Sequence, residues 1–121
     1  MENTIRVLKV EPGKAPYVKE IVDDYKVSQS EVGGDIDCFD TEDGCVVVHN
    51  AVGKNRKLEP NRRYADDIIC GSFFICAEGE DGDFISLTDE QIEKYSKQFA
   101  EIEQFSGQEP ELDGKMTLLS L

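Results

Sequence analysis

The stretch Ile68-Ile-Cys-Gly-Ser-Phe-Phe-Ile-Cys-Ala77 decides the fold that we expect for this chain. It is the most apolar run of the sequence, it is short, and it is rich in β-branched and aromatic residues. A run of this kind is typical of a strand in the middle of a sheet, where both faces are covered. The sequence therefore predicts one central strand over residues 68–77, with Gly71 at a bend or bulge.

Further strand signals lie on the N-terminal side of this run. Residues 4–10 are rich in β-branched side chains and are followed by a Pro-Gly turn, which predicts a first strand. Residues 35–39 and 45–49 have the composition of two more strands. The polar segment between them contains Gly44, which can adopt the backbone angles of a tight turn, so these two strands are predicted to form a hairpin.

Two segments carry helix signals. Residues 21–32 place apolar side chains at roughly helical spacing before Gly33-Gly34, and glycine is common at helix ends. Thr88-Asp-Glu-Gln91 matches the capping box that opens many helices. The helix that follows is predicted to end near Gly107 and to pack through one apolar stripe. The stripe consists of Ile92, Tyr95, Phe99, Ile102 and Phe105.

Together these elements predict an α+β fold. We expect a mixed or antiparallel sheet of about four or five strands with two helices, of which the C-terminal one packs on one face of the sheet. A length of 121 residues fits one domain, which we place at residues 1–107. Residues 108–121 form an expected C-terminal tail, and its last apolar residues suggest an edge strand.

Composition and charge limit the classes of protein to consider. The chain carries a net charge of −13, with 39% hydrophobic residues, six Phe and four Tyr, so it has enough apolar residues to fold. It shows no secretory signal and no apolar stretch long enough to cross a bilayer, which predicts a cytoplasmic protein without a membrane partner. The acidic charge disfavours direct nucleic-acid binding, so the expected partner is a protein.

The four cysteines and the single histidine do not form a recognisable catalytic or metal motif. The cysteines lack the Cys-x-x-Cys spacing of a zinc site, and in a cytoplasmic protein they are expected to be free thiols. No metal or cofactor is predicted. The phosphate-binding and hydrolase motifs are missing as well, so an enzyme that uses His49 or Cys70 on a small molecule is only the third functional hypothesis.

A basic segment interrupts the acidic sequence, and it is expected to be irregular in structure. Arg62 and Arg63 could together grip an anion, because guanidinium groups suit bidentate recognition. Alternatively, the arginines only relieve the repulsion among the many acids. The segment contains Lys54, Arg56, Lys57, Arg62 and Arg63.

The acids support a second functional hypothesis. A stripe of carboxylates can imitate the phosphates of DNA and so occupy the cationic groove of a DNA-binding enzyme. The chain would then inhibit a host defence system such as restriction or CRISPR. A solvated acidic surface is the simpler interpretation of the same residues. The candidate stripe consists of Asp81, Asp83, Asp89, Glu90, Glu93, Glu101 and Glu103.

An ordered series of short motifs carries a family resemblance. It runs from Val-Glu-Pro-Gly-Lys-Ala-Pro-Tyr17 through Pro60-Asn-Arg62 to Asp67-Ile-Ile-Cys-Gly-Ser-Phe-Phe-Ile75. With these motifs the chain resembles the 3846 family of domains of unknown function, which are short bacterial, phage and plasmid proteins. The resemblance covers about residues 4–105 and implies an origin in a mobile element, without an established activity.

The same resemblance points to Glu11, Pro12, Gly13, Asn61 and Arg62, which a hydrophobic core alone would not require. The first functional hypothesis is therefore a non-enzymatic accessory protein that binds a protein partner. Its expected binding residues are Glu11, Gly13, Tyr17, Asn61 and Arg62.

Overall fold

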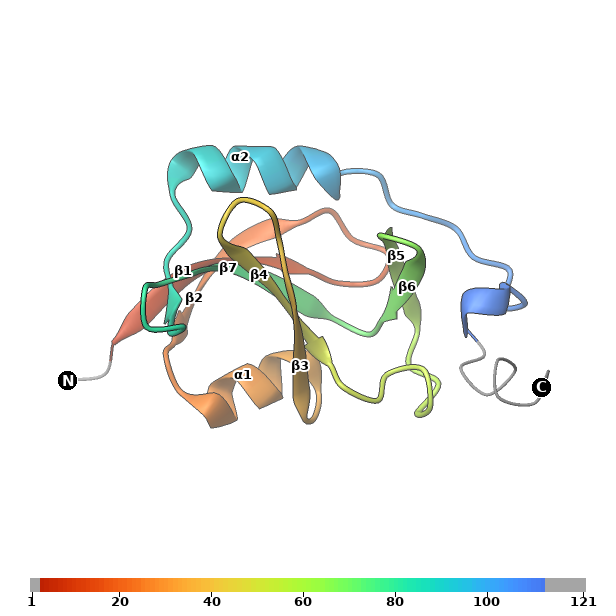
Figure 1. The fold of residues 1–121 in the computed structure, drawn as a ribbon. Helices are drawn as coiled ribbons and strands as arrows, with labels where there is room; N and C mark the ends of the chain where they lie inside the picture. Colours follow the sequence, from red (N-terminus) through yellow and green to blue (C-terminus); the bar gives the residue numbers. More distant parts are fainter. Residues whose placement is uncertain (1–2, 113–121) are drawn as a thin grey trace.

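An antiparallel sheet between two helices forms the centre of the structure, a computed structural model that describes residues 3–112 (Figure 1). The strands follow the order β2-β1-β7-β4-β3, and β8 pairs with β7. A second sheet consists of β5 and β6. The elements are β1 (Thr4–Val10), β2 (Tyr17–Val22), α1 (Tyr25–Val32), β3 (Ile36–Asp40), β4 (Cys45–Asn50), β5 (Pro60–Tyr64), β6 (Asp67–Cys70), β7 (Phe73–Glu78), β8 (Phe84–Ile85), α2 (Asp89–Gln98) and the short 3₁₀ helix η1 (Pro110–Leu112). The predicted α+β class is confirmed, and so is the helix on one face.

Strand β7 is the middle of the sheet and is covered on both sides. Successive side chains of a strand point to opposite faces. Phe73 and Ile75 therefore join the hydrophobic layer under α2, whereas Phe74 and Cys76 join the layer over α1. Each of these four side chains is fully buried. This double burial explains why the strand has a continuous apolar sequence rather than an alternating one.

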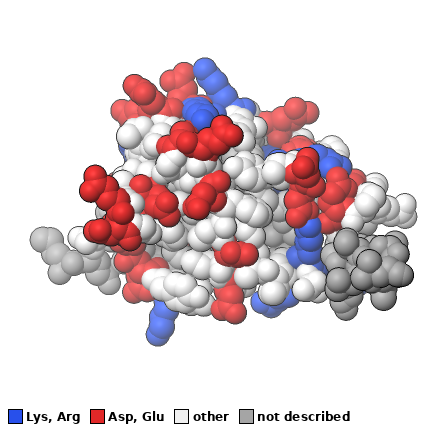
Figure 2. All heavy atoms as spheres, viewed as in Figure 1, with Lys and Arg blue, Asp and Glu red and all other residues white. Residues whose placement is uncertain are grey.

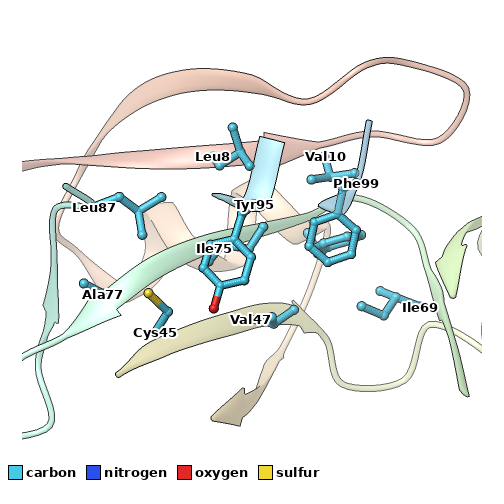
Figure 3. Packing of buried hydrophobic residues seen from close by; sticks show 11 residues of the cluster. Leu8, Val10, Cys45, Val47, Ile69, Ile75, Ala77, Leu87, Tyr95 and Phe99 are labelled. Carbon is cyan, nitrogen blue, oxygen red and sulfur yellow. The ribbon is translucent and has the colours of Figure 1, made fainter. Parts of the chain in front are cut away.

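The helix α2 covers one of the two layers. Its N-terminus is fixed by the predicted capping box, in which Gln91 N donates to Thr88 Oγ1 at 3.1 Å and Thr88 N donates to Gln91 Oε1 at 2.9 Å. Tyr95 and Phe99 point from the helix into the layer, where Figure 3 shows them beside Ile75 and its neighbours. Burying two aromatic side chains contributes about 3 to 6 kcal/mol relative to leaving them exposed.

The turn between β3 and β4 ties this helix to the sheet. Asp43 accepts hydrogen bonds from Lys94 Nζ at 2.8 Å, from Tyr95 Oη at 2.5 Å and from Thr41 Oγ1 at 2.5 Å. The bond from Lys94, followed by those from Thr41 and Tyr95, holds the pKa of the Asp43 carboxyl well below its usual value. The carboxylate is thus stabilised by three donors from two elements.

The helix α1 covers the opposite face and is held there by an ion-pair cluster. Lys9 of β1 is buried, and its Nζ donates to Glu31 Oε1 at 2.6 Å and to the Glu31 backbone oxygen at 2.9 Å. Lys19 of β2 reaches the same carboxylate at 2.9 Å. Two positive charges therefore lie near the C-terminal end of α1, which the helix dipole favours.

The predicted helix over residues 21–32 is wrong in its first part. Residues 17–22 form β2, which pairs with β1 in register from Tyr17 opposite Lys9 to Val22 opposite Thr4. The helix begins only after Asp24, whose carboxylate caps it by accepting from Lys26 N at 2.7 Å. Pairing with β1 satisfies the backbone of the segment, and this outweighs a weak helical pattern.

The single strand predicted over residues 68–77 is also wrong, because the chain changes sheets within it. Residues 67–70 form β6 in the small sheet, and β7 begins at Phe73. Gly71 lies between them with a φ of 85°. A Cβ at this position would lie 2.8 Å from Leu58 Cδ1, so the expected bend at Gly71 requires glycine for two reasons.

Two further boundaries differ from the predictions. The basic segment is not irregular throughout, because Pro60–Tyr64 forms β5. The helix α2 ends with Phe99 at its C-cap instead of continuing to Gly107, so Ile102 and Phe105 follow the helix. Residues 113–121, which include the predicted edge strand of the tail, lie outside the described residues.

Candidate binding site

Three of the predicted binding residues lie at the turn between β1 and β2. Tyr17 Oη donates to Glu11 Oε2 at 2.5 Å, and Lys14 Nζ lies 3.3 Å from Glu11 Oε1. The hydrogen bond from Tyr17 lowers the pKa of Glu11, and it raises the pKa of Tyr17 to about 12. Gly13 has a φ of 75°, which explains the glycine in this turn. The Glu11–Tyr17 pair is a polar feature at the surface, since Tyr17 is 39% exposed.

Asn61 and Arg62, the other two predicted binding residues, lie beneath this turn and are each only 1% exposed. Asn61 Nδ2 donates to the carbonyl oxygens of Val10 at 3.0 Å and Gly71 at 2.9 Å. It therefore joins the end of β1 to the bend before β7. The structure places Asn61 and Arg62 close to the turn that holds Glu11 and Gly13, and the function of these residues in binding stays a prediction.

The guanidinium of Arg62 connects three segments through backbone oxygens. Arg62 Nε donates to Phe99 O at 3.1 Å, Nη2 donates to Lys14 O at 2.7 Å, and Nη1 donates to Asn61 O at 3.2 Å and to Asn61 Oδ1 at 2.8 Å. No carboxylate within residues 3–112 forms an ion pair with it, and burial lowers the pKa of Arg62. Because Phe99 is the C-cap of α2, the positive charge lies at the negative end of the helix dipole.

The basic segment does not form an anion clamp. Arg62 and Arg63 are neighbours on β5, so their side chains point to opposite faces. Arg62 is buried, whereas Arg63 Nη1 forms a 2.5 Å ion pair with Glu111 Oε2 at the surface. Lys54 forms an ion pair with Asp67. The two arginines therefore cannot grip one anion between them.

The seven acids of the predicted stripe come from three places: the connection before β8, the helix α2, and the segment after it. Asp89 Oδ1 pairs with Arg6 Nη2 at 2.9 Å, and Glu93 Oε1 pairs with Lys97 Nζ at 3.1 Å. In the view of Figure 2, acidic side chains are spread over the surface, with uncharged surface and several basic side chains between them. The hypothesis that these acids imitate the phosphates of DNA stays a prediction.

A pocket of about 370 Å³ lies on the sheet face that α2 shares, where the ends of β3 and β4 approach β6. Its polar wall includes the only histidine of the chain, a cysteine and two carboxylates. One side is formed by residues 51–55, which are held close to β6: a Cβ on Gly53 would lie 2.6 Å from Cys70 O. The lining residues are Asp37, Phe39, His49, Asn50, Ala51, Val52, Gly53, Lys54, Asn55, Asp67, Ile68, Ile69 and Cys70.

His49 carries an unsatisfied nitrogen. Its Nδ1 lies 3.0 Å from Asn50 O, and because a carbonyl oxygen only accepts, we assign the proton to Nδ1. Nε2 is then an acceptor, and it is buried without a hydrogen-bond partner among the described residues. The ring stacks on Phe39 with centroids 4.6 Å apart. An unpaired buried acceptor is uncommon and is costly unless a water or a ligand group satisfies it.

Asp37 supplies uncompensated negative charge to the pocket. It lies opposite His49 in the ladder between β3 and β4, so the two side chains share a face. Asp37 Oδ1 accepts from Cys38 N at 2.9 Å, but no lysine or arginine of residues 3–112 pairs with the carboxylate. The other carboxylate, Asp67, is already neutralised by Lys54.

Cys70 also lines the pocket but lacks the features of a nucleophile. It is 6% exposed, and burial raises the pKa of its thiol. A thiol with a raised pKa carries little thiolate near neutral pH, and the thiolate is the reactive form. His49 and Cys70, the two residues of the enzyme hypothesis, are thus brought to one pocket without an activated thiol.

The sequence analysis missed the pocket apart from these two residues. Its wall combines the hairpin of β3 and β4 with β6, and only the packing of the β5–β6 hairpin brings them together. The alternation of Asp37 and Phe39 on the predicted strand was the available signal, since both side chains lie on one face with His49.

The fold and this site define a small α+β domain with an open pocket, partly polar and partly apolar, beside an edge strand. Residues 5–100 match the model of a family described as a domain of unknown function, DUF3846, and the chain belongs to this family. No curated protein and no solved structure matches the chain. Within the described part of the chain, no helix is long and apolar enough to cross a membrane.

Proposed function

We propose that this chain is a binding protein whose pocket receives a positively charged group with N–H donors, such as the guanidinium of an arginine side chain. The observation that carries the proposal is the pairing of an uncompensated carboxylate, Asp37, with an unsatisfied acceptor, His49 Nε2, around one pocket. A cation with several N–H groups could pair with Asp37, and it could reach the buried His49 Nε2 when the ring turns toward the pocket.

Two other features support a cationic ligand. Phe39 lines the pocket and is 38% exposed, and a guanidinium group can lie favourably against an aromatic face. The net charge of −13 also attracts cations at long range and raises their concentration near the surface. An anionic ligand would meet repulsion from both Asp37 and the field of the whole protein.

Binding is favoured over catalysis by the state of the thiol. Cys70 has a raised pKa because it is buried, and the amine of Lys54 in the pocket wall is held in an ion pair with Asp67. The origin in a mobile element, the accessory role and the cytoplasmic location stay predictions of the sequence. They are compatible with a protein that recognises a basic group on a partner.

The proposal can be tested with two ligands of nearly the same shape. N-acetylarginine methylamide carries the guanidinium, whereas the citrulline derivative replaces it with a neutral urea group. In titrations followed by NMR, we expect the arginine derivative to shift the His49 ring signals and to bind roughly tenfold more tightly, because it forms a charge-assisted contact.

The matched variants are Asp37→Asn and Asp40→Asn. Both remove one carboxylate from β3, but Asp40 lies on the other face of the strand and does not line the pocket. Asp37→Asn should remove the preference for arginine, and Asp40→Asn should keep it. Equal binding of the arginine and citrulline derivatives by the native protein would refute the proposal.

A further inference from the structure

The strand β3 is an edge of the main sheet, with β4 as its neighbour on one side only. The outward backbone groups can be assigned from the two ends of the ladder. Ala51 N donates to Asp35 O, and Thr41 N donates to Cys45 O. Since hydrogen-bonded and non-hydrogen-bonded pairs alternate along an antiparallel ladder, the outward N–H and C=O groups belong to Ile36, Cys38 and Asp40. Of these, the Cys38 N–H donates to the side chain of Asp37 in the free protein.

This edge is open and acidic. Four of its five residues are exposed, and the exposed side chains include both an aromatic ring and carboxylates. The carboxylates of Asp35, Asp37 and Asp40 form no ion pair within residues 3–112. The other edge, β2, instead carries Lys19 beside Glu20, and Lys19 pairs with Glu31. The two edges therefore differ in charge.

We propose that β3 is a docking site for an extended, lysine- or arginine-rich segment of a partner protein, which adds to the sheet as a further strand. Such addition uses backbone hydrogen bonds for affinity and alternate side chains for specificity. The inference rests on the proposed function of the pocket, because it names the partner that supplies the cationic group.

The geometry connects the edge to the pocket. A strand that pairs with β3 places every second side chain on the face of Asp37 and Phe39. These two residues line the pocket, so a basic side chain of the added strand beside Asp37 points to the pocket mouth. The intervening side chains of the added strand lie on the face of Cys38 and Asp40, where Asp40 offers a second negative charge.

Charge also selects this partner over a second copy of the chain. Two copies that paired through β3 around a two-fold axis would bring the carboxylates of identical strands close together. Like charges across a strand pair destabilise it, and charged edge strands are a common protection against self-association. A basic segment is instead attracted by the same carboxylates.

The test uses defined peptides. The probe is a peptide of about eight residues that alternates lysine with valine, labelled with a fluorophore, because a strand of this length covers β3. A second peptide has glutamate in place of lysine, and a third keeps lysine but carries N-methyl groups on alternate backbone amides. Dissociation constants come from fluorescence anisotropy at low and at high salt.

We expect the lysine peptide to bind and the glutamate peptide not to bind. N-methylation should weaken binding at least about tenfold, because it removes the backbone donors that pair with β3. The variant Cys38→Pro removes an outward N–H of β3, which donates to Asp37 Oδ1 in the free protein and would donate to the added strand on docking. It should weaken binding similarly, since proline is tolerated on edge strands. The matched control is Glu20→Pro, which removes an outward N–H of β2 and should leave binding unchanged.

Three results would overturn the inference. One is equal binding of the lysine peptide and its N-methylated form. Another is full binding by a folded Cys38→Pro protein together with loss in Glu20→Pro. The last is strong protection of the Ile36 and Asp40 amides from hydrogen exchange in the dilute free protein, because the edge would then already be covered by a second copy or by the chain itself.

Failure of this inference and failure of the proposed function give different results. If the arginine derivative binds the pocket while peptide binding ignores N-methylation, the docking inference fails and the pocket proposal stands. If N-methylation weakens peptide binding but Asp37→Asn changes nothing, the edge accepts a strand and the pocket proposal fails.

Discussion

Replacing Arg62 with alanine is expected to lower the stability of the fold by about 3 kcal/mol. The change leaves the carbonyl oxygens of Lys14, Asn61 and Phe99 without their donor, at roughly 1 kcal/mol each. Losing the buried stem of the side chain costs about 2 kcal/mol more. Part of this loss is offset, because the desolvated charge is removed as well.

Urea unfolding followed by circular dichroism measures this effect. With a slope of about 1.5 to 2 kcal/mol per molar urea, the midpoint should fall by roughly 1.5 to 2 M without a change in slope. The control is Arg63→Ala, the next residue on β5, whose ion pair with Glu111 lies at the surface and should leave the midpoint close to that of the native protein.

A small effect would contradict this account of Arg62. If the free energy of unfolding of Arg62→Ala lies within about 1 kcal/mol of the native value, the hydrogen bonds of Arg62 to the backbone add little to stability. The guanidinium would then be free to serve a ligand, as the sequence-based binding hypothesis has it.

Two further predictions concern ionisation and thiol reactivity. The folded pKa of Asp43 is depressed, so the stabilisation from its carboxylate is present above the ordinary aspartate pKa of about 4 and is lost as the pH falls below it. The difference in unfolding free energy between the native protein and Asp43→Asn should therefore be larger at pH 7 than at pH 3, and an equal difference at both would contradict the assigned bonds. Iodoacetamide should modify Cys38 first in the folded protein, because Cys45, Cys70 and Cys76 are buried. Mass spectrometry of the peptides checks this order, and early modification of Cys70 would show that the pocket opens more than the structure indicates.

The elements that the sequence predicted correctly have local signals. Residues 4–10 have a strand composition that a Pro-Gly turn ends, and both features lie within a few residues. The signal for the hairpin of β3 and β4 is equally local, since Gly44 has the positive φ of 79° that the turn requires. At Thr88 the capping box fixed the start of α2 for the same reason.

The errors arose where contacts between residues far apart in the sequence determine the local structure. Ile21 and Val22 end a strand whose partner is β1, but beside Tyr25 they imitate a helical pattern. The run from residue 68 to 77 has one composition, and it leaves one sheet for the other at Gly71, where Leu58 leaves no room for a Cβ. Sequence composition does not contain such contacts.

The candidate site was predictable only in part. The family resemblance grouped Glu11, Asn61 and Arg62, which do lie together, but a buried arginine and a surface arginine look the same in a sequence. The pocket depends on the position of the β5–β6 hairpin against β4. Its two acceptors, Asp37 and His49, become neighbours only through the register of β3 and β4.

The central position of β7 has a consequence for synthesis on the ribosome. β7 pairs with β1 on one side and with β4 on the other, and both partners precede it in the chain. The β1–β2 and β3–β4 hairpins therefore emerge first, each with an apolar face that has no cover. Neither layer can close until residues 73–78 have left the exit tunnel, so the nascent chain is expected to fold late and to need protection of these faces until then.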